Sequence, residues 1–247
     1  MATLPELIYC SDGNKRFAQI AIEAGFTYGA QLPKTVYFDP EFVDQDYKNP
    51  DLEKYSTAVA RYKPRMATVL DWQRWEQLPI VLMWAETIAA FIETIIIIPK
   101  VMGGIAHLPN KVGNKPVRLG FSTPTSFGAT AVPMKEFGDW PVHLLGGSPV
   151  MQRKLSKYLN VASLDGNYHL LMATRYNQFF YPDGSARWAK NRFWPTLKEA
   201  NSGKKWGDGD PKADAPYEAF RRSCTAIIDM WYNRLPNKTK NYSLPGL

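Results

Sequence analysis

Two short stretches in the middle of the chain end in residue types that could do chemistry. The first, residues 142–149, contains Gly146 and Gly147, and the second, residues 161–169, contains Asp165. Each is an apolar run that ends in a polar, glycine-containing turn, and the basic segment between them has the length of one helix. Functional groups collect at the carboxyl ends of the strands in parallel strand–helix–strand units. We therefore expect Asp165 to lie beside the bare backbone of the two glycines, which suggests a pocket.

Apolar runs of strand length alternate with helical stretches or loops along the first two-thirds of the chain. This alternation is typical of a parallel sheet with helices between its strands. We predict an α/β fold with a TIM-like (β/α)8 barrel, and a doubly wound open sheet is the alternative topology. The expected strands are 7–10, 27–32, 66–70, 94–98, 117–121, 142–145 and 161–164, with an eighth near 178–181.

The helical segments complete the expected architecture. Helices are predicted at 14–24, 51–62, 77–91 and 150–159, the first opened by a cap at 11–13 and closed by Gly25. Residues 200–212 are polar and glycine-rich, which predicts a flexible loop. Helical periodicity then returns at about 217–232. We interpret this last helix as a C-terminal extension that closes a single domain over residues 1–247.

The bulk properties exclude some classes of protein. The formal charge of +7 and the isoelectric point near 9.3 favour a polyanionic partner without requiring one. Cys10 and Cys224 are the only cysteines, which excludes a disulfide framework and fits a reducing compartment. The apolar segment 78–98 contains Pro79, Glu86 and Glu93, so it is better explained as a buried helix and strand than as a membrane span. The first residues lack a signal-peptide pattern, and we expect a cytoplasmic protein.

The two glycine-containing turns resemble the tRNA-guanine transglycosylase superfamily. Members of that family have a Leu-Met-Gly-type turn in the barrel and a nucleophilic Asp at the end of the next strand, which matches the spacing from Leu145-Gly146 to Asp165. The stretches 165–173 and 181–185 are more similar to the archaeosine-type branch and its DNA-modifying relatives than to the queuosine branch. A further match is Asp71, which is followed four residues later by the aromatic Trp75. The resemblance covers residues 7–190.

The resemblance implies an exchange of bases on a nucleoside. Asp165 would capture the anomeric carbon as the N-glycosidic bond breaks, and Asp71 would serve as general acid and base. Trp75 and Leu145 would hold the flat heterocycle between them. The remaining residues expected in the base pocket are Trp72 and three glycines that admit backbone amides to the base edge, namely Gly120, Gly146 and Gly147.

The chain also departs from the family pattern. It has no cysteine cluster after the proposed nucleophile, so no zinc and no other metal is expected, and no cofactor beyond the 7-deazaguanine co-substrate. No carboxylate occurs at Pro99-Lys100, where the family has a second base-reading Asp. We also expect no appended RNA-binding domain. The compact, zinc-free form resembles virus-encoded DNA transglycosylases of phage type, which implies exchange of guanine in single- or double-stranded DNA for a 7-deazaguanine such as preQ0.

Basic residues flank the proposed nucleophile and could hold phosphates. The alternative is that they form a solvated helix face. They are Arg153, Lys154 and Lys157 on the helix between the two turns, and Arg175, Arg187, Lys190 and Arg192 after the nucleophile.

Each candidate also has a purely structural explanation. Asp165 or Asp71 could be a turn or cap residue, and Trp75 could be packing. His143 is better explained as a hydrogen-bonded core histidine than as a ligand. Two other functions stay open: a tRNA-guanine transglycosylase, or a nucleic-acid-binding barrel without catalysis.

Overall fold

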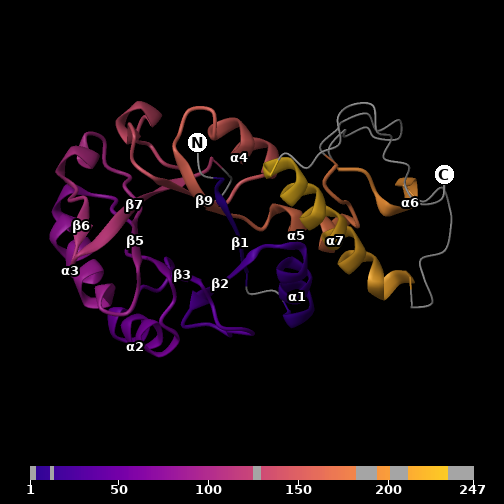
Figure 1. Cartoon of the computed structure of the whole chain (residues 1–247), viewed down its shortest axis with the longest axis horizontal. Helices are drawn as coiled ribbons and strands as arrows, with labels where there is room; N and C mark the ends of the chain where they lie inside the picture. The colour runs from indigo at the N-terminus through magenta and orange to yellow at the C-terminus, as the bar shows by residue number, and fades with distance from the viewer. Residues whose placement is uncertain (1–3, 12–13, 125–128, 182–193, 201–210, 233–247) are drawn as a thin grey trace. The chain divides into compact units, whose positions relative to one another are not determined.

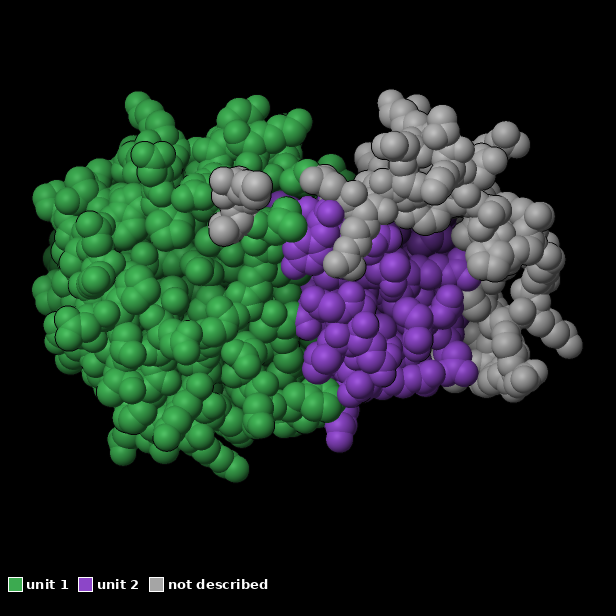
Figure 2. Space-filling model, in the orientation of Figure 1, with its two compact units in different colours: residues 1–13, 27–166 green, residues 14–26, 167–247 purple. Residues whose placement is uncertain are grey.

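The computed structural model describes residues 4–11, 14–124, 129–181, 194–200 and 211–232 (Figure 1). The chain divides into two compact units (Figure 2). The first comprises residues 1–13 and 27–166, and the second comprises residues 14–26 and 167–247. Among the described residues, all the strands lie in the first unit, and the second unit contains helices.

The first unit contains a closed barrel of eight parallel strands, which confirms the predicted TIM-like architecture. The barrel closes where β1 pairs with β9 and where β5 pairs with β7. The short β6 (Lys111–Val112) is an antiparallel addition to β7. The barrel strands are β1 (Glu6–Cys10), β2 (Thr27–Leu32), β3 (Phe42–Gln45), β4 (Met66–Thr68), β5 (Thr94–Ile97), β7 (Lys115–Ser122), β8 (Val142–Leu145) and β9 (Val161–Asp165).

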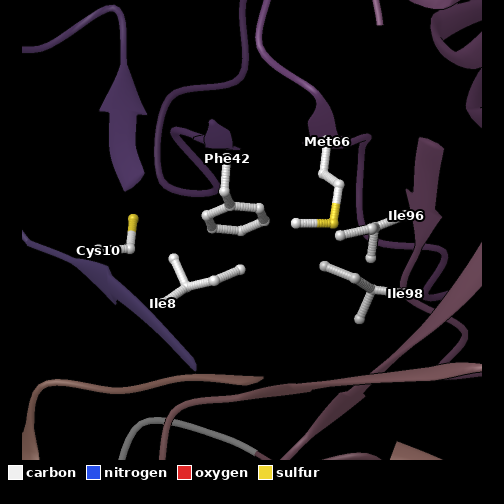
Figure 3. Packing of buried hydrophobic residues seen from close by; sticks show 6 residues of the cluster. All are labelled: Ile8, Cys10, Phe42, Met66, Ile96 and Ile98. Atoms are coloured by element: carbon white, nitrogen blue, oxygen red, sulfur yellow. The ribbon is translucent and has the colours of Figure 1, made fainter. Parts of the chain in front are cut away.

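Apolar side chains from several strands fill part of the barrel interior. Because side chains alternate in direction along a strand, Ile8 and Cys10 of β1 point to the same side as each other. Leu145 packs against the buried cluster that they form together with side chains from β3, β4, β5 and the residue just after β5. Figure 3 shows this cluster. Its members are Ile8, Cys10, Phe42, Met66, Ile96 and Ile98.

Three helices of the first unit follow their strands as the sequence predicts. The helix α2 (Leu52–Tyr62) begins where the Asp51 side chain accepts a hydrogen bond from the amide of Lys54. The apolar α3 (Leu78–Ala89) precedes β5, and α4 (Pro149–Leu155) joins β8 to β9. Short 3-10 turns complete the unit: η1 (Trp75–Gln77), η2 (Gly104–His107) and η3 (Met134–Phe137). No helix of the described part of the chain is long and apolar enough to cross a membrane.

The second unit is helical. It contains α1 (Lys15–Ala24), α5 (Tyr168–Tyr176), α6 (Leu197–Ala200) and α7 (Pro211–Trp231). Asn14 caps the start of α1, and Gly25 ends it with a φ of 106°. The ring of Phe17 stacks on Tyr217 at 4.4 Å, which joins α1 to α7.

The eighth strand lies elsewhere than predicted. The barrel is completed by β3 (Phe42–Gln45), whereas residues 178–181 contain only an isolated antiparallel bridge from Gln178 to Thr196. The prediction was wrong because β3 is short and ends in Asp44 and Gln45, so its apolar signal is weak. The helix predicted at 217–232 is present as α7, which begins earlier, at Pro211, and ends at Trp231. Of the predicted loop at 200–212, residues 201–210 lie outside the described part.

A buried histidine in the second unit is expected to make its stability depend on pH. His169 lies against Phe220, with ring centroids 5.0 Å apart, and burial lowers the pKa of His169 from 6.5 to about 3. Between pH 6.5 and pH 3, His169 is protonated in the unfolded chain and neutral in the folded chain. The stability that the neutral, buried ring contributes is therefore complete above pH 6.5 and is lost as the pH falls toward 3. We expect His169→Phe to flatten the fall of the melting temperature between pH 7.5 and pH 4.5. His107→Phe, at an exposed histidine, is the control, and equal acid sensitivity in all three proteins would contradict this expectation.

Candidate active site at the carboxyl ends of the barrel strands

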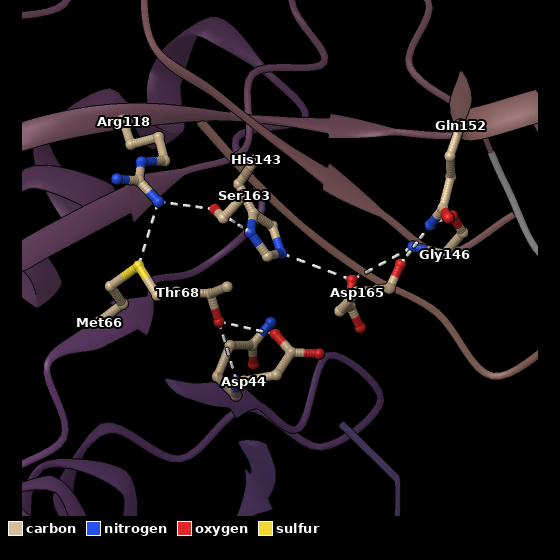
Figure 4. Close-up of polar contacts among 10 residues, drawn as sticks. Asp44, Met66, Thr68, Arg118, His143, Gly146, Gln152, Ser163 and Asp165 are labelled. Carbon is tan, nitrogen blue, oxygen red and sulfur yellow. Dashed lines mark hydrogen bonds and ion pairs between the residues drawn. The ribbon is translucent and has the colours of Figure 1, made fainter. Parts of the chain in front are cut away.

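The two glycine-containing turns meet at the carboxyl ends of β8 and β9, as predicted (Figure 4). The amide of Gly146 donates a hydrogen bond of 3.2 Å to Oδ1 of Asp165. Gln152 of α4 holds both turns, because its Nε2 donates to the carbonyl of Gly146 at 2.8 Å and to that of Asp165 at 2.6 Å. The Asp165 side chain remains 15% exposed, so its carboxylate is fixed but reachable.

Both glycines of the first turn have a left-handed backbone, with φ of 68° at Gly146 and 84° at Gly147. A Cβ on Gly147 would lie 2.3 Å from Cγ2 of Thr123, whereas a Cβ on Gly146 would meet nothing within 4 Å. The left-handed backbone thus favours glycine at both positions, and at Gly147 the contact with Thr123 leaves no room for a Cβ atom.

This difference gives a matched pair of variants. We expect Gly147→Ala to lower the free energy of unfolding by about 3 kcal/mol, because strain at positive φ and the clash with Thr123 add up. Gly146→Ala should cost about 1 kcal/mol, since it carries the strain alone. Urea denaturation of both variants measures the difference. Equal losses would show that the contact with Thr123 has no energetic weight.

A polar chain approaches Asp165 from inside the barrel. Nη1 of Arg118 on β7 donates to Oγ of Ser163 on β9 at 2.6 Å, and that Oγ lies 2.7 Å from Nδ1 of His143 on β8. Nε2 of His143 lies 3.4 Å from Oδ1 of Asp165. This distance is long for a hydrogen bond, yet Nε2 is buried and has no closer partner in the described residues. His143 is thus a hydrogen-bonded core residue, as expected, and it also faces the candidate nucleophile.

A second carboxylate that the sequence did not reveal is Asp44 of β3. By strand alternation it points to the same side as Phe42, whose ring lies against His143 at 4.9 Å. Its Oδ1 accepts a hydrogen bond of 2.7 Å from Oγ1 of Thr68. Burial raises the pKa of Asp44 from 3.8 to about 7, the Thr68 hydrogen bond opposes this, and the charges of Asp165 and Asp71 raise it further. Asp44 therefore lies within electrostatic range of both Asp165 and Asp71.

Asp71 follows β4 and is engaged by a cation. Its Oδ2 lies 2.6 Å from Nζ of Lys100, which follows the neighbouring strand β5. Lys100 thus pairs with Asp71 from the segment in which the resemblance to transglycosylases predicts a carboxylate and the sequence has none. The backbone holds this pairing, because the amide of Lys100 donates to the carbonyl of Trp72 at 2.8 Å.

The two tryptophans after Asp71 have different environments. Trp72 is completely buried, and its Nε1 donates to the carbonyl of Arg74 at 2.8 Å, so its ring is not available to a base. Trp75 is 47% exposed and presents its ring at right angles to Trp72 and to His107. Stacking on a base therefore stays a prediction for Trp75 alone.

Gly120 serves the packing of the barrel. A Cβ at this position would lie 2.6 Å from Cγ1 of Ile98 and 2.8 Å from Cδ1 of Leu145. The glycine thus lets these two side chains close in from either side. The amide of Gly146 already donates to Asp165. These two glycines therefore have a structural role in the protein, whether or not they also approach a ligand.

Comparison with known proteins places the chain in a family. The family of unknown function DUF6610 matches residues 21–232. The chain belongs to DUF6610. The match includes Asp44, Asp71 and Asp165 together with the polar chain that leads to Asp165. No curated protein matches the sequence.

The basic residues predicted to hold phosphates are only partly placed in this DUF6610 chain. Arg153 of α4 is half-buried, Lys154 is exposed in the last turn of that helix, and Lys157 is exposed just after it. Arg175 is exposed on α5 of the second unit. The other three lie outside the described residues: Arg187, Lys190 and Arg192.

Two further features bear on ligands. No group of three or more His, Cys, Asp or Glu side chains that could hold a metal occurs among the residues the structure describes. Surface hollows of about 600 Å³ and about 500 Å³ are both lined by Asn110, Glu136 and Trp140. Neither hollow contains a candidate site residue, and the carboxylates at the strand ends provide the stronger chemical argument.

Proposed function

We propose that the chain is a base-exchange transglycosylase that replaces guanine in DNA with a 7-deazaguanine such as preQ0. The observation that supports this best is the state of Asp165, a reachable carboxylate with one oxygen fixed and the other free. Oδ1 accepts from the amide of Gly146 and faces His143, while Oδ2 has no hydrogen-bond or ion-pair partner among the described residues. A nucleophile that is held in this way needs little further ordering when it attacks.

The proposed reaction has two displacements at the anomeric carbon. In the first, Oδ2 of Asp165 bonds to C1′, the glycosidic bond breaks, and its electron pair leaves with guanine, which takes up a proton. In the second, the incoming 7-deazaguanine loses a proton, attacks C1′, and releases Asp165. One glycosidic bond breaks and one forms overall, so no energy-rich cofactor is needed.

We assign the proton steps to Asp44 in preference to Asp71. Asp44 has a pKa of about 7, close to the value at which one group can both donate and accept a proton near neutral pH. Asp71 is already paired with Lys100 at 2.6 Å. Its remaining acceptor capacity suits the N–H edge of a guanine, and the exposed Trp75 four residues later could stack on the ring. Arg153, Lys154 and Lys157 would contact the phosphates.

The test is release of labelled guanine. The protein is incubated with DNA labelled in guanine and, separately, with labelled tRNA, each with and without preQ0. We expect release from DNA that depends on preQ0 and on the protein. Release from tRNA alone would replace this function by that of a tRNA-guanine transglycosylase. Binding of DNA without release from either would support the non-catalytic nucleic-acid-binding barrel.

A further inference from the structure

The interior of the barrel contains a chain of polar groups whose hydrogen-bond directions can be worked out. It begins at Arg118, which also lies 3.1 Å from Sδ of Met66 on β4, and passes through Ser163 and His143 to Asp165 (Figure 4). Ser163 and His143 are completely buried. Buried polar groups must find their partners within the protein, so each proton in this chain has a definite place.

The direction of each hydrogen bond follows from Arg118. A guanidinium has donors only, so Oγ of Ser163 must be the acceptor in the 2.6 Å contact with Nη1. The single hydroxyl proton of Ser163 is then free to donate to Nδ1 of His143 at 2.7 Å. An Nδ1 that accepts is unprotonated, so the proton of a neutral imidazole lies on Nε2. That is the nitrogen that faces Oδ1 of Asp165.

The opposite direction leaves a buried donor without a partner. If Nδ1 donated to Ser163, the hydroxyl proton of Ser163 would need another acceptor. Within the described part of the chain the hydroxyl contacts only Arg118 and His143, and it is closed to solvent. Leaving a buried hydroxyl proton unsatisfied is costly, so the first direction is favoured.

We propose that Arg118, acting through Ser163, fixes His143 in the tautomer protonated on Nε2, and that this N–H positions the Asp165 carboxylate. Phe42 supports the arrangement, since its ring stacks on His143 with 25° between the planes and resists rotation of the imidazole. Oδ1 of Asp165 then faces two donors, Nε2–H and the amide of Gly146. Arg118, Ser163 and His143 are thus positioning residues. Only the use of Asp165 as a nucleophile rests on the proposed function; the tautomer does not.

The tautomer can be observed directly by NMR. The chain has three histidines, His107, His143 and His169, so a protein labelled with 15N-histidine gives a simple long-range 1H–15N spectrum. His143→Gln assigns the signals. We expect the Nδ1 shift of His143 to be that of an unprotonated nitrogen and the Nε2 shift that of a protonated one. A protonated Nδ1, with or without a proton on Nε2, would overturn the proposal.

Three variants test the role of each partner. Ser163→Ala removes the hydroxyl proton, and Arg118→Met frees that proton to turn away, so both should shift the His143 signals toward a mixture of tautomers. Arg118→Lys keeps a pure donor and should keep the wild-type signals. If the variants fold, wild-type signals in both Ser163→Ala and Arg118→Met would refute the role of Arg118 and Ser163 in fixing the tautomer. If the variants do not fold, the spectrum of the wild-type protein alone decides which tautomer is present.

The effect on base exchange is a separate measurement. If Asp165 is the nucleophile, we expect Ser163→Ala to lower kcat by about 10-fold to 100-fold with little change in KM, because a positioned carboxylate matters more in the transition state than in substrate binding. If His143 has the expected tautomer but the protein exchanges no base, the inference about His143 stands and the proposed function is rejected. If the protein exchanges bases but Nδ1 of His143 is protonated, the proposed function stands and the inference about His143 is rejected.

Discussion

Asp165→Asn is expected to abolish base exchange and to leave the barrel folded and able to bind DNA. An amide oxygen cannot form the ester-like bond to C1′, so the loss should be at least about 10⁴-fold in kcat. The fold should tolerate the change, because Oδ1 of an asparagine can still accept from the amide of Gly146 at its present distance of 3.2 Å. Release of labelled guanine measures the first effect, and a DNA mobility shift measures the second.

The matched control is Asp139→Asn, which makes the same chemical change at an exposed residue before β8. It should exchange bases at the wild-type rate. An Asp165→Asn protein with unchanged exchange would remove Asp165 from the mechanism and with it the proposed reaction. A protein that has lost both exchange and its native circular dichroism spectrum would direct the test to Asp165→Glu, whose longer side chain should retain the charge but misplace it.

The sequence predicts the architecture wherever strands have a strong apolar signal. The run 94–98 and the two runs that end at Leu145 and Asp165 have this signal, and both the barrel and the contact between the two turns follow from them. The strand Phe42–Gln45 does not, because half of it is polar. Asp44 lies near the carboxyl end of this strand, where inward-pointing side chains reach the mouth of the barrel. A polar residue at such a position is compatible with a strand, although the pattern alone resembles that of a loop.

The spacing of residues in the sequence also does not predict which of two nearby side chains is buried and which is exposed. Trp72 and Trp75 have the same residue type within one short segment, yet the first is completely buried and the second is 47% exposed. The same holds for Asp71, whose pairing with Lys100 depends on the adjacency of β4 and β5 in the barrel. Such contacts between distant segments are decided by the closure of the sheet, which no local pattern encodes.

Asp44→Asn is the second change with a large expected effect. If Asp44 supplies the proton to the departing guanine, replacing it should slow exchange by about 10²-fold to 10³-fold. The wild-type kcat/KM should fall as the pH rises above about 7, because Asp44 then loses its proton. The variant should lack this fall and show a low, flat rate over the same range. A wild-type rate in the variant, or a fall that persists in it, would contradict the assignment of Asp44.

The same substitution should have the opposite effect on stability. Burial raises the pKa of Asp44 from 3.8 to about 7, so the folded chain binds a proton more tightly than the unfolded chain. The resulting stabilisation is complete below pH 3.8 and is lost as the pH rises through 7. The neutral asparagine can keep the hydrogen bond from Thr68 and has no charge to bury. Asp44→Asn should therefore gain stability relative to the wild type between pH 5 and pH 8, as urea denaturation at these two values can show, and a gain in stability together with a loss of exchange would identify Asp44 as a residue kept for chemistry and not for folding.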